Sequence, residues 1–382
     1  MSRSCTLYHN TEAMIGHFPP SAYSESPERI IAIEAMLKGI PYEEIDKLYR
    51  KSRSGLVTLH REIPVMHDSL WARCESVHVT ADESSRKAIE ATYGKKMLQY
   101  IEDSIPESGT DIDAADPDLY WSTGSMTAAT TAVAAALRAT QDVLDGKTDT
   151  AFAIVRPPGH HCFDMPAGFC VFNNVLIAAR RAMDSGKRVA IVDWDYHFGD
   201  GTARALLKEE SAMFISLHCR QSRGGLMSYP RNTADDLKGE GLAVMTNGRC
   251  FNVQWNMDDA NNAAYCDAFT TLIVPAIKKF GADIVFVSAG YDAVRGDDLA
   301  GMELSTGAFG YMASSLAGIG KPVVAVLEGG YNPRLLAESA CETVLGLRGD
   351  EPYNRPCWLM IPLFKEHKEV IDRVKAMLEC NA

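Results

Sequence analysis

Five short apolar runs along the chain each end in a loop that opens with polar or glycine residues. The runs cover residues 151–155, 189–192, 213–215, 284–287 and 323–327. Each run is short and apolar throughout, as expected of strands that are buried on both faces of a parallel sheet. Ligands bind beyond the carboxyl ends of such strands, so we expect the five following loops to converge on one pocket.

Helical patterns fill the spaces between these runs. One helix is predicted from Pro27 to Leu37, with Ser26 as its N-cap, and an alanine-rich one from Gly124 to Leu144. Further helices are predicted at 174–183, 263–280 and 307–317. Strands that alternate with helices of this length predict an α/β fold, in which helices cover both faces of a central parallel sheet.

Composition narrows the class of protein. The 382 residues include no Pro/Gly/Ser-rich linker, charge block or repeat, so we expect one domain. A net charge of −12 argues against direct nucleic-acid binding, and the short basic run 50–53 is best explained as a solvated loop. Neither a signal region nor an apolar stretch of about 18 residues is present, which predicts a protein that is neither secreted nor membrane-spanning.

The ten cysteines form no CxxC pair, which suits a reducing compartment. Cys162 and Cys170 lie near the predicted pocket, but their spacing matches no thiolate zinc pattern. We interpret both as residues of the pocket wall.

The stretch Asp-Trp-Asp-Tyr-His at 193–197 directly follows an apolar run and is the most informative in the chain. Asp193, Asp195 and His197 alternate, so they point the same way if the backbone stays extended. Carboxylate and imidazole together suit zinc or a similar divalent ion. The stretch therefore predicts half of a metal site at the end of a strand.

Asp292 is the expected third ligand beside Asp195 and His197. It lies just past a strand end in a loop made tight by Gly290, whereas 297–298 are expected in a solvated turn. Three protein ligands leave coordination positions open, as in a catalytic rather than a structural site.

Proton transfer is assigned to His160 and His161, which follow a stiff Pro-Pro-Gly turn. Asp193 and Asp200 are the carboxylates available to orient them. Tyr331, after two glycines, has a hydroxyl placed to stabilise an oxyanion. Each motif alone is common in turns, but their joint occurrence at strand ends predicts metal-assisted hydrolysis of an amide.

Together these motifs resemble those of the arginase-like zinc deacetylases, specifically the class II histone deacetylase branch. The matching segments are 26–30, 156–161, 168–174, 192–197, 216–218, 288–292 and 328–332. The resemblance implies a single-domain arginase/deacetylase-like fold over 1–382, with a core at about 7–349 and a C-terminal helical extension at about 360–380.

The same resemblance implies a hydrolase that removes acetyl groups from lysine side chains of proteins, with one catalytic zinc ion on Asp195, His197 and Asp292. His161 would be the general base and later the acid, and Tyr331 would polarise the carbonyl group. His160 would be an electrostatic partner linked to Asp193, and Asp200 would raise the basicity of His161. A structural potassium ion is implied at Asp193, Asp195, His197, Ser216 and Leu217.

For the substrate, the resemblance implies a narrow tunnel between Phe169, next to Gly168, and Tyr229, where relatives usually have Phe. Burial of the four lysine methylenes there is worth about 0.8 kcal/mol each. Asp118 is assigned to grip the substrate backbone. Leu299 stands at a rim position where an acidic residue marks polyamine-selective relatives, so a peptide-borne acetyl-lysine is favoured.

Two further departures from the family pattern affect the metal loop. Phe198 replaces a second histidine, which predicts altered packing rather than loss of zinc. Asp200 replaces the usual Asn, which predicts a more basic His161.

Three alternatives stay open: an acetylpolyamine amidohydrolase, a weakly active acyl-lysine binding module, and an arginase-like enzyme, which would need a second set of metal ligands. The expected partners are acetylated proteins or peptides and, in addition, regulatory proteins, in the nucleus or cytoplasm. The sequence leaves open histones against tubulin or other proteins, and zinc against iron. Selectivity is expected from rim loops at 51–70, 75–93 and 221–241.

Overall fold

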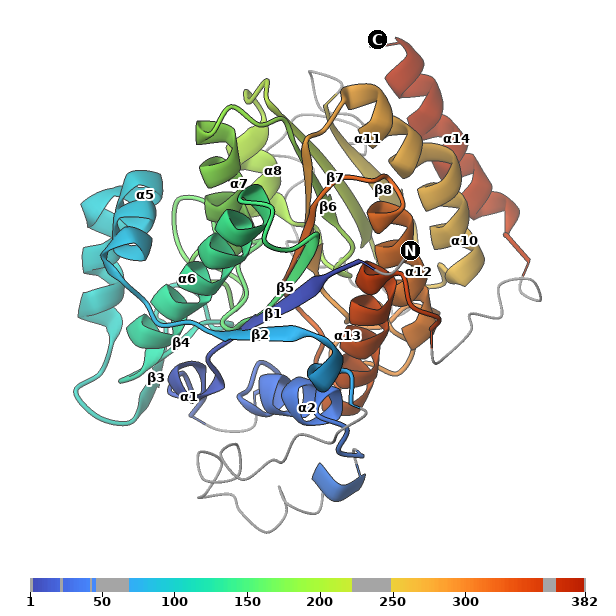
Figure 1. Cartoon of the computed structure of the whole chain (residues 1–382). Helices are drawn as coiled ribbons and strands as arrows, with labels where there is room; N and C mark the ends of the chain where they lie inside the picture. Colours follow the sequence, from blue (N-terminus) through green and yellow to red (C-terminus); the bar gives the residue numbers. More distant parts are fainter. Residues whose placement is uncertain are drawn as a thin grey trace.

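Eight strands form one fully parallel sheet in the order β2-β1-β5-β10-β9-β6-β7-β8 (Figure 1). This is a computed structural model, which describes residues 3–20, 23–41, 43–45, 69–221, 249–352 and 362–380. The strands are β1 (Cys5–His9), β2 (Glu75–His78), β5 (Thr150–Ile154), β6 (Val189–Asp193), β7 (Ala212–Cys219), β8 (Cys250–Trp255), β9 (Ile284–Ala289) and β10 (Val323–Leu327). A short antiparallel pair, β3 (Thr110–Ile112) and β4 (Tyr120–Ser122), lies apart from it.

Helices cover both faces of the sheet. Helix α6 packs on β1, β5 and β10 and α7 on β6 and β9, whereas α12, α13 and α2 form a layer on the other side (Figure 1). The described helices are α1 (Thr11–Met14), α2 (Glu28–Leu37), α5 (Glu83–Ser104), α6 (Ser125–Leu144), α7 (Asn174–Asp184), α8 (Asp200–Leu206), α10 (Asn262–Ala268), α11 (Val274–Phe280), α12 (Thr306–Ala317), α13 (Pro333–Arg348) and α14 (Lys365–Cys380), with short η1 (Trp71–Arg73) and π-helical η2 (Phe269–Ile273) segments. The predicted fold class is confirmed.

The five apolar runs are the five adjacent central strands β5, β10, β9, β6 and β7. Every residue of these strands is buried, which explains why they lack the alternation of half-exposed strands. Since all are parallel, their carboxyl ends meet at one edge of the sheet. The sheet order therefore brings the five predicted loops together.

Several sequence predictions needed correction. Ser26 is not the N-cap of α2: Pro27 occupies that position without a side-chain cap, and the helix begins at Glu28. The helix predicted at 263–280 is interrupted by the π-helical turn η2, and the run at 213–215 is part of the longer strand β7. Strands β1, β2 and β8 had no counterpart in the five runs. The basic run 50–53 lies outside the described residues.

A buried ionic cluster ties the segment before α2 to two of the loops. Glu25 accepts hydrogen bonds from Arg156 (2.6 Å to Nη2) and Arg29 (3.1 Å to Nη1), and from the hydroxyl of Tyr120 at 2.6 Å. Although burial opposes ionisation, the two guanidinium groups lower the pKa of Glu25 to about 2. Arg29 also donates to the carbonyl oxygens of Gly330 and Glu328. The cluster thereby fixes the loops after β5 and β10 relative to each other.

Among the described residues, no helix combines the length and apolarity needed to cross a membrane.

Candidate metal centre and active site

Asp195, His197 and Asp292 converge where β6 and β9 end. Their candidate ligand atoms all lie within 4.8 Å of one another. Nδ1 of His197 is 3.1 Å from Oδ1 of Asp195 and 2.9 Å from Oδ2 of Asp292. Strand β6 ends at Asp193, so the backbone does not stay extended to His197, and Asp193 points to a different partner. The predicted alternation is therefore wrong as a description of the loop, although Asp195 and His197 do lie together with Asp292.

The electrostatics of this triad call for a cation. Burial and the charge of Asp195 raise the pKa of Asp292 to about 7. Burial favours a neutral His197, yet the charges of Asp292 and Asp195 raise its pKa to about 10. A divalent ion would take the place of that stabilised proton, and two carboxylate oxygens with one imidazole nitrogen suit zinc. The residues present therefore fit the metal that the sequence predicts.

Two glycines leave room for the carboxylates. A Cβ atom on Gly290 would lie 1.9 Å from Oδ2 of Asp195, and one on Gly329 would lie 2.6 Å from Oδ2 of both Asp195 and Asp292. The backbone N–H of Gly329 also donates to Oδ2 of Asp195 at 2.9 Å. An added side chain at either position would thus collide with the carboxylates of Asp195 or Asp292.

Each predicted catalytic histidine has a carboxylate on its Nδ1. His160 is 3.0 Å from Oδ2 of Asp193, and His161 is 2.9 Å from Oδ1 of Asp200, with the two ring centroids 4.1 Å apart. A carboxylate on Nδ1 fixes the ring orientation and leaves Nε2 for the chemistry of the site.

The two histidines differ in charge. Burial and the charge of His160 together lower the pKa of His161 to about 4, although Asp200 opposes both effects. For His160, burial is outweighed by the charges of Asp195 and Asp193, which raise its pKa well above the ordinary value. The pair therefore offers one neutral imidazole and one imidazolium side by side.

Tyr331 lies in the loop after β10, with its ring 5.7 Å from that of Phe169 and Arg29 stacked over it at 5.1 Å. Burial raises the pKa of its hydroxyl well above 10, so it stays protonated. Asp297, expected in a solvated turn, is instead half-buried and accepts hydrogen bonds from the backbone N–H groups of Tyr331 (2.6 Å) and Asn332 (3.1 Å). That expectation was wrong, because the carboxylate anchors the tyrosine loop.

Phe169 is held in a strained turn. Ala167 and Cys170 exchange both backbone hydrogen bonds, so Gly168 and Phe169 form a two-residue hairpin loop in which both have positive φ, 53° and 67°. A bulky residue rarely adopts this conformation. Asp116 stabilises the turn by accepting the N–H of Gly168 at 2.9 Å. The turn places the ring of Phe169 beside that of Tyr331.

The other predicted substrate residues are less defined. Tyr229 lies outside the described residues, and the ring of Tyr23 lies 6.3 Å from that of Phe169. Asp118 is exposed, and it is its neighbour Asp116 that bonds to the Gly168 turn. Leu299 is also exposed, at 47%.

For the implied potassium site, Asp193 and Ser216 are paired across β6 and β7, with Leu217 the next residue. The hydroxyl of Ser216 is 2.8 Å from Nδ1 of His218. Phe198, the departure from the family pattern, packs on His218 with ring centroids 4.6 Å apart.

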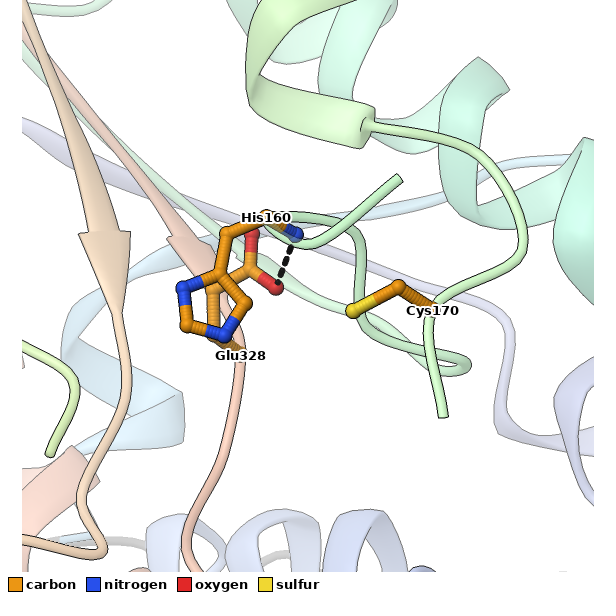
Figure 2. A group of neighbouring side chains, drawn as sticks. All are labelled: His160, Cys170 and Glu328. Carbon is orange, nitrogen blue, oxygen red and sulfur yellow. Dashed lines mark hydrogen bonds between the residues drawn. The ribbon is translucent and has the colours of Figure 1, made fainter. Parts of the chain in front are cut away.

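Glu328 is a site residue to which sequence reasoning assigned no role. Figure 2 shows its carboxylate, the His160 ring and the Cys170 thiol directed toward one another. Oε2 accepts the backbone N–H groups of Gly159 (2.6 Å) and His160 (3.1 Å), and Oε1 is buried without a hydrogen-bond partner among the described residues. Burial raises the pKa of Glu328 to about 7. The sequence did carry a signal for Glu328: like Asp193, it is a carboxylate at the end of a fully apolar strand.

Both pocket cysteines are inert. Burial raises the pKa of Cys162 to about 12, and that of Cys170 well above its ordinary value. The thiol of Cys162 packs in an apolar cluster and donates to the carbonyl of Val171.

Comparison with known proteins identifies a family to which this chain is similar. The family model described as histone deacetylase domain matches residues 49–347. The chain is 34% identical to Histone deacetylase HDA1 of Candida albicans over 287 residues (73% of this chain, 33% of that protein). It is 34% identical to Histone deacetylase 15 of Arabidopsis thaliana over 265 residues (69% and 47%), and 33% identical to Polyamine deacetylase HDAC10 of Homo sapiens over 288 residues (74% and 42%).

The chain thus spans a third to a half of the length of these curated relatives. A solved structure described as the crystal structure of the HDA15 HD domain superposes with a TM-score of 0.76 at 24% identity, covering 99% of this chain and 95% of that chain. The superposition supports the fold.

We expect Gly290→Ala to lower zinc affinity about 10- to 100-fold, because the new methyl group must displace Asp195. Competition with a chromogenic chelator measures it. Gly318→Ala is the matched control: its φ is −65°, and no atom lies closer than 3.2 Å to the added Cβ. Equal affinities in the two variants would show that Asp195 is not a ligand.

Phe169→Gly should be more stable than Phe169→Ala by about 1 kcal/mol, because both variants lose the ring but only glycine adopts a φ of 67° without strain. Thermal unfolding of the two proteins under identical conditions measures the difference. Equal midpoints would mean that the turn relaxes once the ring is gone.

Proposed function

This chain belongs to the histone deacetylase domain family, and on that premise we propose that it is a zinc-dependent hydrolase that removes acetyl groups from lysine side chains of proteins. The observation that carries the proposal is the juxtaposition of three kinds of group. The triad Asp195, His197 and Asp292 lies beside two carboxylate-oriented histidines and a buried, protonated tyrosine. Amide hydrolysis needs each of these: a Lewis acid, a base that becomes an acid, and a donor to the oxyanion.

Zinc held by Asp195, His197 and Asp292 would supply Lewis acidity to the attacking water and the acetyl carbonyl. His161 is the residue fitted to accept the proton of that water, since burial keeps its imidazole neutral near pH 7. The same imidazole then returns the proton to the leaving lysine nitrogen. Asp200 holds the ring in place on its other nitrogen.

His160 and Tyr331 stabilise charge. The imidazolium of His160, bonded to Asp193, places positive charge next to the reacting centre. Tyr331 donates its hydroxyl hydrogen to the developing oxyanion, and its loop is held by Asp297 and Arg29. Glu328 fixes the backbone of the histidine loop from the loop after β10, which also carries Tyr331, so one loop helps to position both the base and the oxyanion donor.

The proposed substrate stem runs along Phe169 and Gly168, with Tyr229 as the second wall. Asp118 is assigned to the substrate backbone and Leu299 to the rim. The half-buried ring of Phe169 beside Tyr331 supports this path, because a lysine stem in contact with it would bring the acetyl group to the tyrosine hydroxyl. The exposed apolar side chain of Leu299 offers no partner to a second cationic group of a substrate.

Acetylpolyamine hydrolysis is the second candidate, favoured by the 33% identity to a human polyamine deacetylase. Both activities use the same catalytic residues. They differ at the rim, where a polycation would need a carboxylate and a peptide would not.

We also propose a potassium ion near the metal loop, with Asp193, Asp195, His197, Ser216 and Leu217 supplying oxygen ligands. The cross-strand pairing of Asp193 with Ser216 supports it. We propose further that 1–382 acts as one catalytic domain in the nucleus or cytoplasm, with acetylated proteins as substrates and regulatory proteins as partners.

Tyr331→Phe tests the proposal. Zinc-loaded protein should hydrolyse an acetyl-lysine peptide in preference to N-acetylspermidine, and loss of the hydroxyl should lower kcat about 100- to 1,000-fold. Tyr311→Phe removes a remote hydroxyl bonded to Thr270 and should leave turnover unchanged. Faster turnover of the polyamine would select the second candidate. Binding of both compounds without turnover by the zinc-loaded protein would make the chain an acyl-lysine binding module.

Asp200→Asn should shift the acidic limb of the kcat/KM profile to lower pH. The Asp200 carboxylate raises the pKa of His161, so its removal lets His161 stay neutral at lower pH. The weaker base should also lower the plateau rate. A pH series with Asp184→Asn, an exposed carboxylate, provides the control. An unmoved limb would assign the titration to another group.

A further inference from the structure

Cys5 and Cys74 are neighbours across the edge of the sheet. Strands β1 and β2 are parallel, with Thr6 opposite Glu75; Cys5, the first residue of β1, and Cys74, the residue just before β2, each precede this pair by one position. Adjacent strands lie about 4.8 Å apart, which is within the Cα separation that a disulfide spans. Side chains at equivalent positions of paired strands also point to the same face. The two strands lie side by side in Figure 1.

The two thiols differ in burial and charge. Cys5 is 3% exposed, whereas Cys74 is half-buried. The neighbouring Cys5 thiol lowers the pKa of Cys74, and Arg348 and Arg73 lower it further against the effect of burial. Nη1 of Arg348 lies 4.0 Å from the Cys74 sulfur. Cys74 is thus a partly exposed thiol beside fixed positive charge, with a second thiol at the neighbouring position across the sheet.

We propose that Cys5 and Cys74 form an oxidation site that hydrogen peroxide converts to a disulfide. The Cys74 thiolate attacks one peroxide oxygen: an S–O bond forms, the O–O bond breaks, and the released hydroxide takes a proton to become water. The Cys5 sulfur then attacks the Cys74 sulfur: the S–S bond forms, the S–O bond breaks, and the departing hydroxide combines with the Cys5 proton. Two thiols lose two electrons to one peroxide, and two waters result.

This site is separate from the metal centre. Cys5 is the first residue of β1, and it pairs with Thr150, the first residue of β5. The cysteine pair therefore lies at the amino ends of the strands, whereas Asp195, His197 and Asp292 lie beyond the carboxyl ends. The oxidation site does not depend on the proposed activity, and failure of either proposal leaves the other intact.

Peptide mapping after mild peroxide treatment tests the proposal. The reduced full chain is exposed to peroxide, alkylated and digested with trypsin without reduction, which separates the relevant cysteines into peptides 4–29, 74–86 and 335–348. We expect peptides 4–29 and 74–86 to be joined by a disulfide that dithiothreitol cleaves. The mass of the joined species should equal the sum of the two peptide masses minus two hydrogens. The oxidised protein should also unfold at a temperature a few degrees higher, because the bond closes a long loop.

Reactivity before oxidation provides the second measurement. Cys74 should be alkylated by iodoacetamide at least about tenfold faster than Cys266, which is also half-buried but whose pKa burial raises to about 12. Cys74→Ser should abolish the cross-link, and Cys266→Ser should leave it unchanged. Three results would overturn the proposal: Cys74 linked instead to Cys341, Cys74 oxidised to sulfinic acid while Cys5 remains alkylatable, or Cys74 no more reactive than Cys266.

Discussion

Concentrated negative charge at the carboxyl edge of the sheet is the constraint on which the site depends. Asp193, Asp195, Asp292 and Glu328 are all fully buried there. They are balanced in three ways: Asp193 by the His160 ring, Asp195 and Asp292 by His197 and backbone N–H groups, and Glu328 by the N–H groups of the histidine loop. Burial and the charge of Asp195 raise the pKa of Asp292 to about 7, and burial raises that of Glu328 to a similar value. A divalent ion bound between Asp195 and Asp292 would relieve the repulsion between the two carboxylates.

A second charge cluster holds the loops that carry these groups. Arg156 begins the loop that leads to the histidines, and Arg29 bonds to the carbonyl oxygens of the tyrosine loop. Both guanidinium groups share Glu25, and all three side chains are fully buried. Such a cluster adds little net stability, but removal of one member leaves a buried charge without a partner. The geometry of the site is thus coupled to the segment before α2.

Much of the site was predictable from residue types at strand ends. Parallel strands deliver their following loops to one edge, so the motifs after β5, β6, β9 and β10 had to meet once the sheet was inferred. This rule did not identify the residues whose side chains bind backbone N–H groups. Glu328 and Asp297 mainly accept backbone N–H groups from other loops, and nothing in the local sequence reveals which N–H groups a carboxylate will meet.

The sequence by itself determined the fold class, the fully buried central strands and the kinds of ligand at their ends, because periodicity and residue chemistry are local properties. Only the tertiary structure decided which carboxylate serves which partner. The turn after β6 separates Asp193 from Asp195 and sends one to His160 and the other to His197. It also decided that Cys5 and Cys74, distant in sequence, become neighbours. Strand order and loop path set these contacts, and both depend on the packing of the whole chain.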